Sequence, residues 1–249
     1  TSTNGCYRIV TVSSTSGPGA TDERVNFANW YSYYSNRTLV AKTAAGRAFA
    51  RLSDTIRVGY QRLNTCNTGF GIAPTAACPG SIVKPFTGTA RTDFFTWLYA
   101  APANSGTPLR SAFNRAGSYL SNTTANGPWA QTPGTAVGTE YSCRQNFHLG
   151  FTDGLWNTDT TAATGSFGNI DNLGFTFPTP AALPGDSNYQ PYVATYAPGG
   201  TNQLIYPDAN LNSLGDIAFR YWSRDARADL ANDVPKHIPS RTADNNAEF

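Results

Sequence analysis

The sequence is poor in charge and contains no methionine. Asp, Glu, Lys and Arg together make up 14% of its 249 residues, and the net charge is +2. Nucleic-acid-binding proteins usually carry a basic stripe or patch, whereas the Lys and Arg here are scattered, so the composition argues against a nucleic-acid partner. No apolar run approaches the length of a membrane span. The absence of methionine, even at position 1, and of a signal peptide predicts a mature or trimmed piece of a longer protein.

Motifs of the common hydrolases are also missing. The sequence has no Gly-x-Ser-x-Gly elbow, no His-Glu-x-x-His and no phosphate loop, and its glutamates are only Glu23, Glu140 and Glu248. A hydrolase needs a nucleophile with its base, or paired carboxylates in a cleft. His148 lies in an apolar segment, where a core or edge histidine is expected more often than a catalytic one. The sequence therefore favours a protein that is not an enzyme, with a secreted glycan-acting enzyme as the alternative.

The four cysteines contain no Cys-x-x-Cys pair, which argues against a structural zinc site. Cys66 and Cys78 close a short loop rich in Gly, Pro and Ala, which a disulfide would staple, and Cys6 and Cys143 would then form a long-range pair. Abundant Thr, Ser, Asn and Gly are common on secreted and cell-surface proteins. The alternative is four free thiols in a cytosolic protein.

Alternating strand and helix patterns indicate how the chain is organised. The predicted elements are a strand over 6–12, a helix over 22–52 with a bend near Asn36 and Thr38, a strand over 55–63, helices over 93–99 and 108–120, a strand over 146–151 and a helix over 211–230. This order is typical of an α/β fold, with a largely parallel sheet and helices on both faces. Residues 157–210 are rich in Gly, Asn, Thr and Pro and are expected to form a long insertion, with a hairpin near 174–177.

The predicted strand over 146–151 ends at a sharp turn that contains Asp153 and Gly154. Open α/β sheets place ligand and metal sites at such strand ends. Upstream, Thr107 lies in a tight turn that opens the helix over 108–120. A hydroxyl and a carboxylate are the hard oxygen ligands that a Mg²⁺-type ion prefers, so the pair predicts a divalent cation site. Plain turn and capping roles for both residues are the alternative.

The expected insertion carries two further groups of candidate residues. The first is an oxygen-rich group that would hold calcium or form solvated turns, made up of Asp159, Asn169, Asp171 and Asn172. Its spacing fits no EF-hand pattern, which favours solvated turns. The second is a set of aromatic residues that would form either a binding surface or the insertion's own core, made up of Tyr189, Tyr192, Tyr196 and Tyr206.

Two long segments resemble the PilY/PilC family of type IV pilus tip adhesins and assembly factors. One runs from Val25-Asn-Phe-Ala-Asn-Trp-Tyr through Leu39-Val-Ala-Lys to Gly46-Arg-Ala-Phe, and the other from Gly138-Thr-Glu-Tyr-Ser-Cys to Thr152-Asp-Gly-Leu-Trp-Asn. Supporting matches follow in the same order at 57–59, 95–99, 106–109 and 214–225. The resemblance covers roughly residues 20–235. It implies an N-terminal von Willebrand factor A-like domain, here one domain over 1–249 that is truncated at both ends.

The resemblance also implies a metal-dependent adhesion site built from three loops. Thr107 matches the second loop and Asp153 the third, while the first, an Asp-x-Ser-x-Ser turn, has no counterpart between residues 1 and 249. Mg²⁺ or Ca²⁺ would be the cofactor. The implied partners are pilin subunits, other pilus-tip proteins and surface or host ligands, at the pilus tip of a bacterium that exports the protein through its periplasm. The alternative function is a cell-surface scaffold without a working metal site.

Overall fold

The structure is a computed structural model. It describes residues 9–66, 70–135, 138–152, 154–157, 159, 168–170, 175–176, 195–196, 208–222 and 226–231. The chain divides into two compact units, each assembled from separate stretches of sequence. The first unit holds the described residues up to Ile56 together with Phe86–Ala103, and the second holds Arg57–Pro85 and the described residues from Asn104 onward. No described helix is long and apolar enough to cross a membrane.

The described residues of the first unit form three helices, α1 (Arg24–Tyr34), α2 (Arg37–Ala50) and α3 (Gly88–Ala100). The chain breaks between α1 and α2 at Asn36, whose backbone is extended and whose side-chain oxygen accepts a hydrogen bond from the Leu39 N–H at 3.0 Å. This is the N-cap geometry that satisfies a free amide at a helix start. The bend that the sequence predicts near Asn36 therefore separates two helices.

Aromatic rings join α2 to α3 in the core of this unit. Phe94 of α3 lies 4.7 Å from Phe49 of α2 and 5.3 Å from Phe86, measured between ring centroids. Phe86 is only 1% exposed. Arg91 lies over the Phe86 ring and donates hydrogen bonds to the carbonyls of Ala50 and Leu52, just at and beyond the end of α2. Since the last carbonyls of a helix lack internal donors, Arg91 completes α2 as well as covering the core.

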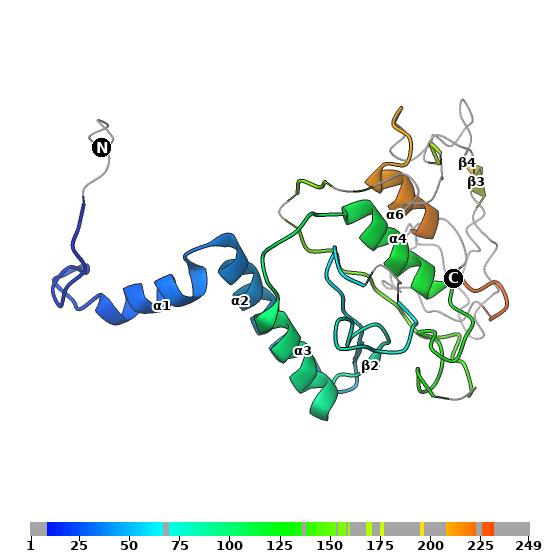
Figure 1. The fold of residues 1–249 in the computed structure, drawn as a ribbon, viewed down its shortest axis with the longest axis horizontal. Coiled ribbons are helices and arrows are strands. Elements are labelled where there is room, and N and C mark those ends of the chain that lie inside the picture. Colours follow the sequence, from blue (N-terminus) through cyan, green and yellow to red (C-terminus); the bar gives the residue numbers. More distant parts are fainter. Residues whose placement is uncertain are drawn as a thin grey trace, which may run out of the picture. The chain divides into compact units, whose positions relative to one another are not determined.

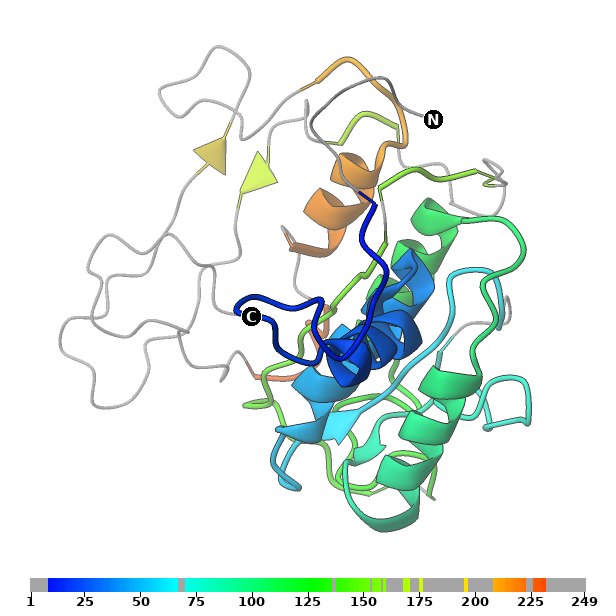
Figure 2. The same ribbon diagram turned by 90° about the vertical axis from the view of Figure 1, so that its left-hand side faces the viewer.

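In the described part of the second unit, helices α4 (Leu109–Leu120) and α6 (Leu214–Trp222) lie side by side (Figures 1 and 2). They run in the same direction. Arg110 Nη1 donates to the carbonyl of Asn212 near their first turns, and the Tyr221 hydroxyl lies 2.8 Å from Ser118 Oγ near their last. Gly117 permits this approach, because a Cβ at that position would collide with the Tyr221 ring.

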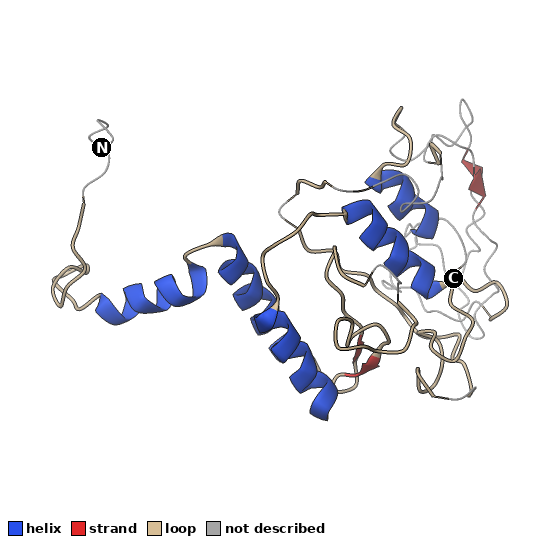
Figure 3. Cartoon of the chain, viewed as in Figure 1, coloured by secondary structure: helices blue, strands red, loops and turns tan. Residues whose placement is uncertain are grey.

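Strands are short in the described residues, where helices and loops predominate (Figure 3). β1 (Arg57–Val58) pairs antiparallel with β2 (Lys84–Pro85), and β3 (Phe175–Thr176) pairs antiparallel with β4 (Thr195–Tyr196). The predicted strand over 55–63 thus shrinks to β1. The segment 146–151 belongs to no strand within the described part of the chain. The layered sheet and the single domain over 1–249 with its insertion stay predictions, because most of 157–210 lies outside the described residues.

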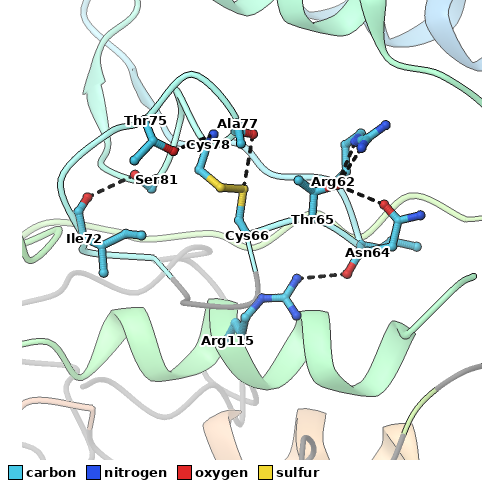
Figure 4. The surroundings of a disulfide bond; sticks show 11 residues. Arg62, Asn64, Thr65, Cys66, Ile72, Thr75, Ala77, Cys78, Ser81 and Arg115 are labelled. Carbon is cyan, nitrogen blue, oxygen red and sulfur yellow. Dashed lines mark hydrogen bonds between the residues drawn. A yellow bond between two sulfur atoms is a disulfide. The ribbon is translucent and has the colours of Figure 1, made fainter. Parts of the chain in front are cut away.

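The Cys66–Cys78 disulfide is present and buried in the second unit (Figure 4). The loop it closes is held by Ser81 Oγ, which donates to the Ile72 carbonyl at 3.0 Å. Arg115 of α4 donates through Nη2 to the Leu63 carbonyl at 3.0 Å, which ties the chain ahead of Cys66 to that helix. The crosslink therefore fixes a loop that already packs beside α4.

Candidate functional site at the start of α4

Thr107 lies two residues before α4 and is fixed through its backbone. Its N–H donates to Asn157 Oδ1 at 2.8 Å, and its carbonyl accepts the N–H of Asn157 at 3.0 Å and of Leu109 at 2.9 Å. The Thr107 hydroxyl has no hydrogen-bond partner among the described residues, and the residue is partly exposed. A positioned but unused hydroxyl oxygen fits the role of a ligand for a hard cation.

Asp153 lies outside the described residues, so the structure gives no distance between Asp153 and Thr107. Its neighbours Thr152 and Gly154 are described. The Gly154 N–H donates to Thr152 Oγ1 at 3.3 Å, and Gly154 has a φ of 107°, in the region that favours glycine. Gly154 therefore has the backbone conformation that a sharp turn needs, while the turn through Asp153 stays a prediction.

The Asp159 carboxylate accepts hydrogen bonds from the backbone N–H groups in the first turn of α4. It accepts the N–H of Arg110 at 2.8 Å, the N–H of Ser111 at 3.2 Å and the Ser111 hydroxyl at 2.7 Å. The Asp159 side chain is 1% exposed, and Arg110 Nε lies 3.6 Å from it. A negative charge here satisfies free amides and complements the helix dipole. The expected solvated turn at Asp159 is therefore wrong, and sequence reasoning missed its capping role.

A second buried carboxylate caps α6. Asp216 is fully buried and accepts the N–H of Ser213 at 2.8 Å and of Ile170 at 2.6 Å, one with each oxygen. Ser213 Oγ in return accepts the Asp216 N–H at 3.0 Å. This reciprocal pair is a capping box. The Ser-x-x-Asp spacing was a signal in the sequence that pattern reading did not use.

Amides and backbone groups join 168–170 to the approach of α6. Asn212 and Gly168 exchange two hydrogen bonds of 2.9 Å, and Asn169 Nδ2 donates to the Asp208 carbonyl at 2.7 Å. Asn169 thus has a structural partner, while Asp171 and Asn172, with Tyr189, Tyr192 and Tyr206, lie outside the described residues. Among the residues that are described, no cluster of three or more His, Cys, Asp or Glu could hold a metal ion.

The remaining candidates are a histidine and two cysteines. His148 packs edge-on against Phe113 of α4, with ring centroids 4.6 Å apart, as a packing histidine would. Cys143 is exposed and forms no disulfide with another described cysteine. Cys6 lies outside the described residues, so its pairing with Cys143 stays a prediction.

The comparisons with known proteins give relatives but no template. No family model matches the chain, and no solved structure matches it. The chain is similar to proteins named type IV pilus biogenesis factor PilY1 from three Pseudomonas aeruginosa strains. The identities are 38% over 96% of this chain for strain PAO1, 40% over 95% for strain PAK and 36% over 100% for strain UCBPP-PA14. The chain spans only 18–19% of the length of these relatives.

Proposed function

Since nearly the whole chain corresponds to one part of the PilY1 proteins and so belongs to their family, we propose that it is a non-enzymatic adhesion and pilus-assembly module at the tip of a bacterial type IV pilus. The observation that carries this proposal is 36–40% identity sustained over at least 95% of the chain. The buried Cys66–Cys78 disulfide agrees with an exported location, because disulfides persist in oxidising compartments. Pilin subunits and other tip proteins would be its partners.

The proposal includes a divalent cation, Mg²⁺ or Ca²⁺, held by Thr107 and Asp153 within a von Willebrand factor A-like fold. Such an ion, when bound, would offer an open coordination position to a carboxylate of the adhesion ligand. The support from this chain is Thr107, whose hydroxyl has no hydrogen-bond partner among the described residues and whose backbone N–H and carbonyl both bond Asn157. Residues 154–157 reach the start of α4 through the same two hydrogen bonds.

Surface attachment by the complete protein tests the proposal. The double variant Thr107→Ala with Asp153→Ala is expected to lose attachment while pili still assemble. A matched control removes the same residue types from exposed positions on α3, Thr89→Ala with Asp93→Ala, and should attach like the parent. Unchanged attachment by the first variant would exclude the cation site as the basis of adhesion.

A scaffold without a working metal site is the second candidate function. The observation that favours it is that Asp159 and Asp216, the described carboxylates at the starts of α4 and α6, are both occupied by backbone N–H groups. The aromatic residues of 157–210 would then make the partner contacts. Calorimetric titration of the purified chain with Mg²⁺, Ca²⁺ and Mn²⁺ separates the two functions, because a scaffold gives no saturable heat.

A further inference from the structure

Two arginines converge on one turn of the second unit, far from Thr107 in the sequence. Arg57 donates through Nη2 to the Pro128 carbonyl at 2.5 Å and through Nη1 to the Ala130 carbonyl at 3.1 Å. Arg144 Nη1 donates to the Trp129 carbonyl at 3.2 Å and also to the carbonyls of Pro128 and Ala130. Because both guanidinium groups bond the same oxygens, their nearest nitrogens lie within about 6 Å of each other.

Within the described part of the chain, the two like charges have no carboxylate of their own. Among the described residues neither Arg57 nor Arg144 forms an ion pair. Glu140, which pairs with Ala130 across an isolated bridge, is bound instead by Arg227, and so is Asp229. Counting described residues, three guanidinium groups thus lie near two carboxylates around the turn, an excess of one positive charge. Burial, and then the charge of Arg144, lower the pKa of Arg57 to about 10, which reflects the cost of this arrangement.

The carbonyls of the turn bind both Nη groups of Arg57 but only one of the donor groups of Arg144. Both Nη atoms of Arg57 are used, whereas the bonds of Arg144 to the turn all come from Nη1. Its Nε and Nη2 have no acceptor within the described part of the chain, and neither is a buried unsatisfied atom. The guanidinium lies over the Tyr141 ring, 4.6 Å from its centroid, and that contact orients the group. The Nε–Nη2 edge is a planar fork that matches the two oxygens of a carboxylate.

We propose that Arg144, backed by Arg57, binds a carboxylate beside the Pro128–Ala130 turn. One free guanidinium edge and one excess positive charge suit a single monoanionic carboxylate. The carboxylate would come from an acidic side chain of a protein partner or from a small carboxylic acid. This site uses neither Thr107 nor Asp153, so it is independent of the proposed cation site.

Nuclear magnetic resonance of the purified chain tests the site directly through the Arg144 Nε–H signal. The probes are sodium acetate, a five-residue blocked peptide with two glutamates, and the same peptide with glutamines. We expect a saturable shift with the glutamate peptide and none with the glutamine peptide. Saturation by acetate alone would assign the source as a small acid, and no saturable shift with either carboxylate would overturn the proposal.

Variants distinguish bidentate binding by the Arg144 guanidinium from attraction by its positive charge alone. Arg144→Gln should abolish saturable binding of the carboxylate probe, and Arg144→Lys should weaken it about tenfold, because an ammonium keeps the charge but loses the bidentate fork. Arg51→Gln removes the same charge from an exposed position and should bind like the parent. Equal loss in Arg51→Gln, or unchanged binding in Arg144→Lys, would contradict the proposal. If Arg144→Gln does not fold, the binding of the carboxylate probe by Arg144→Lys tests the proposal instead.

Discussion

Thr107 and Asn157 hold each other through two hydrogen bonds, 2.8 Å from the Thr107 N–H to Asn157 Oδ1 and 3.0 Å from the Asn157 N–H to the Thr107 carbonyl. These residues lie 50 positions apart in the sequence. Two residues further on, Asp159 binds the next amides of α4. Asn157 and Asp159 therefore both lie beside the first turn of α4, and each contact can be tested separately.

Replacing the Asn157 side chain should loosen this anchor. Asn157→Ala leaves the Thr107 N–H without its acceptor, and we expect the free energy of unfolding to fall by about 1 kcal/mol. Asn157→Asp keeps an oxygen acceptor beside the positive end of α4 and should remain close to the parent. Urea denaturation followed by circular dichroism measures both. Equal stability of parent and Asn157→Ala would mean that the side-chain bond contributes nothing.

Loss of the Asp159 charge should cost more. Asp159→Asn retains one oxygen but removes the charge that two amides and a hydroxyl share, so we expect a loss of about 1–3 kcal/mol in unfolding free energy. Asp93→Asn removes an exposed carboxylate on α3 and serves as the matched control. The same urea denaturation compares the two variants, and an identical small effect in both would show that Asp159 is not a buried cap.

The ion network around Arg227 predicts a dependence on pH. Hydrogen bonds from Arg227 lower the pKa of Glu140 and the pKa of Asp229. A carboxyl whose folded-state pKa is lowered stabilises the protein above its unfolded pKa, and this contribution disappears as the pH falls through the folded pKa. The stability gap between the parent and Glu140→Gln should therefore shrink as the pH falls from about 6 to about 3.

Thermal melting across that pH range measures the gap. Glu23→Gln is the control, because Glu23 forms no ion pair in the described structure and should show no such convergence. A gap for Glu140→Gln that stays constant down to about pH 3 would mean that the folded-state pKa of Glu140 is not lowered by Arg227.

Gly117 should tolerate alanine only when Tyr221 is absent. A Cβ at Gly117 collides with the Tyr221 ring, so Gly117→Ala is expected to cost about 1–3 kcal/mol in unfolding free energy. In a Tyr221→Ala background the same change should stabilise by up to about 1 kcal/mol, since alanine favours the helix more than glycine. A double-mutant cycle by urea denaturation gives the coupling. Additive effects would show that the close approach of α4 and α6 is not limited by this pair.

Helix starts were predicted better from local sequence than helix lengths and faces: the helix predicted over 211–230 is α6 over Leu214–Trp222, and 226–230 are not helical. The proline at 108 and the break at Asn36 mark α4 and α2 within a residue or two, because capping is a local property. On α6 the apolar Ala218 is exposed, while the charged Asp216 and the apolar Phe219 are both buried, so burial does not follow residue type there. Packing against α4 and the capping role of Asp216 set the buried face, and neither shows in hydrophobic periodicity.

The residues of the candidate site likewise include some that the local sequence predicts and some that it does not. The positions of Thr107 and Gly154 could be predicted locally, from a hydroxyl before a helix and a glycine after an apolar segment. Asp159 could not, because the amides that it caps lie 48 and 49 residues away, and no spacing rule links them. The arginine pair at Pro128–Ala130 was also invisible, since Arg57 reaches carbonyls more than 70 positions away in the sequence.

The Cys66–Cys78 crosslink limits how far the chain can be stretched by a pulling force. Tension along the backbone passes through the two sulfur atoms, whose residues have Cα atoms 5.6 Å apart, and bypasses the intervening peptide. The 12-residue separation represents about 40 Å of stretched contour. A pulling force cannot extend this segment until the disulfide is reduced. The fully extended oxidised chain is therefore roughly 35 Å shorter than the fully extended reduced chain.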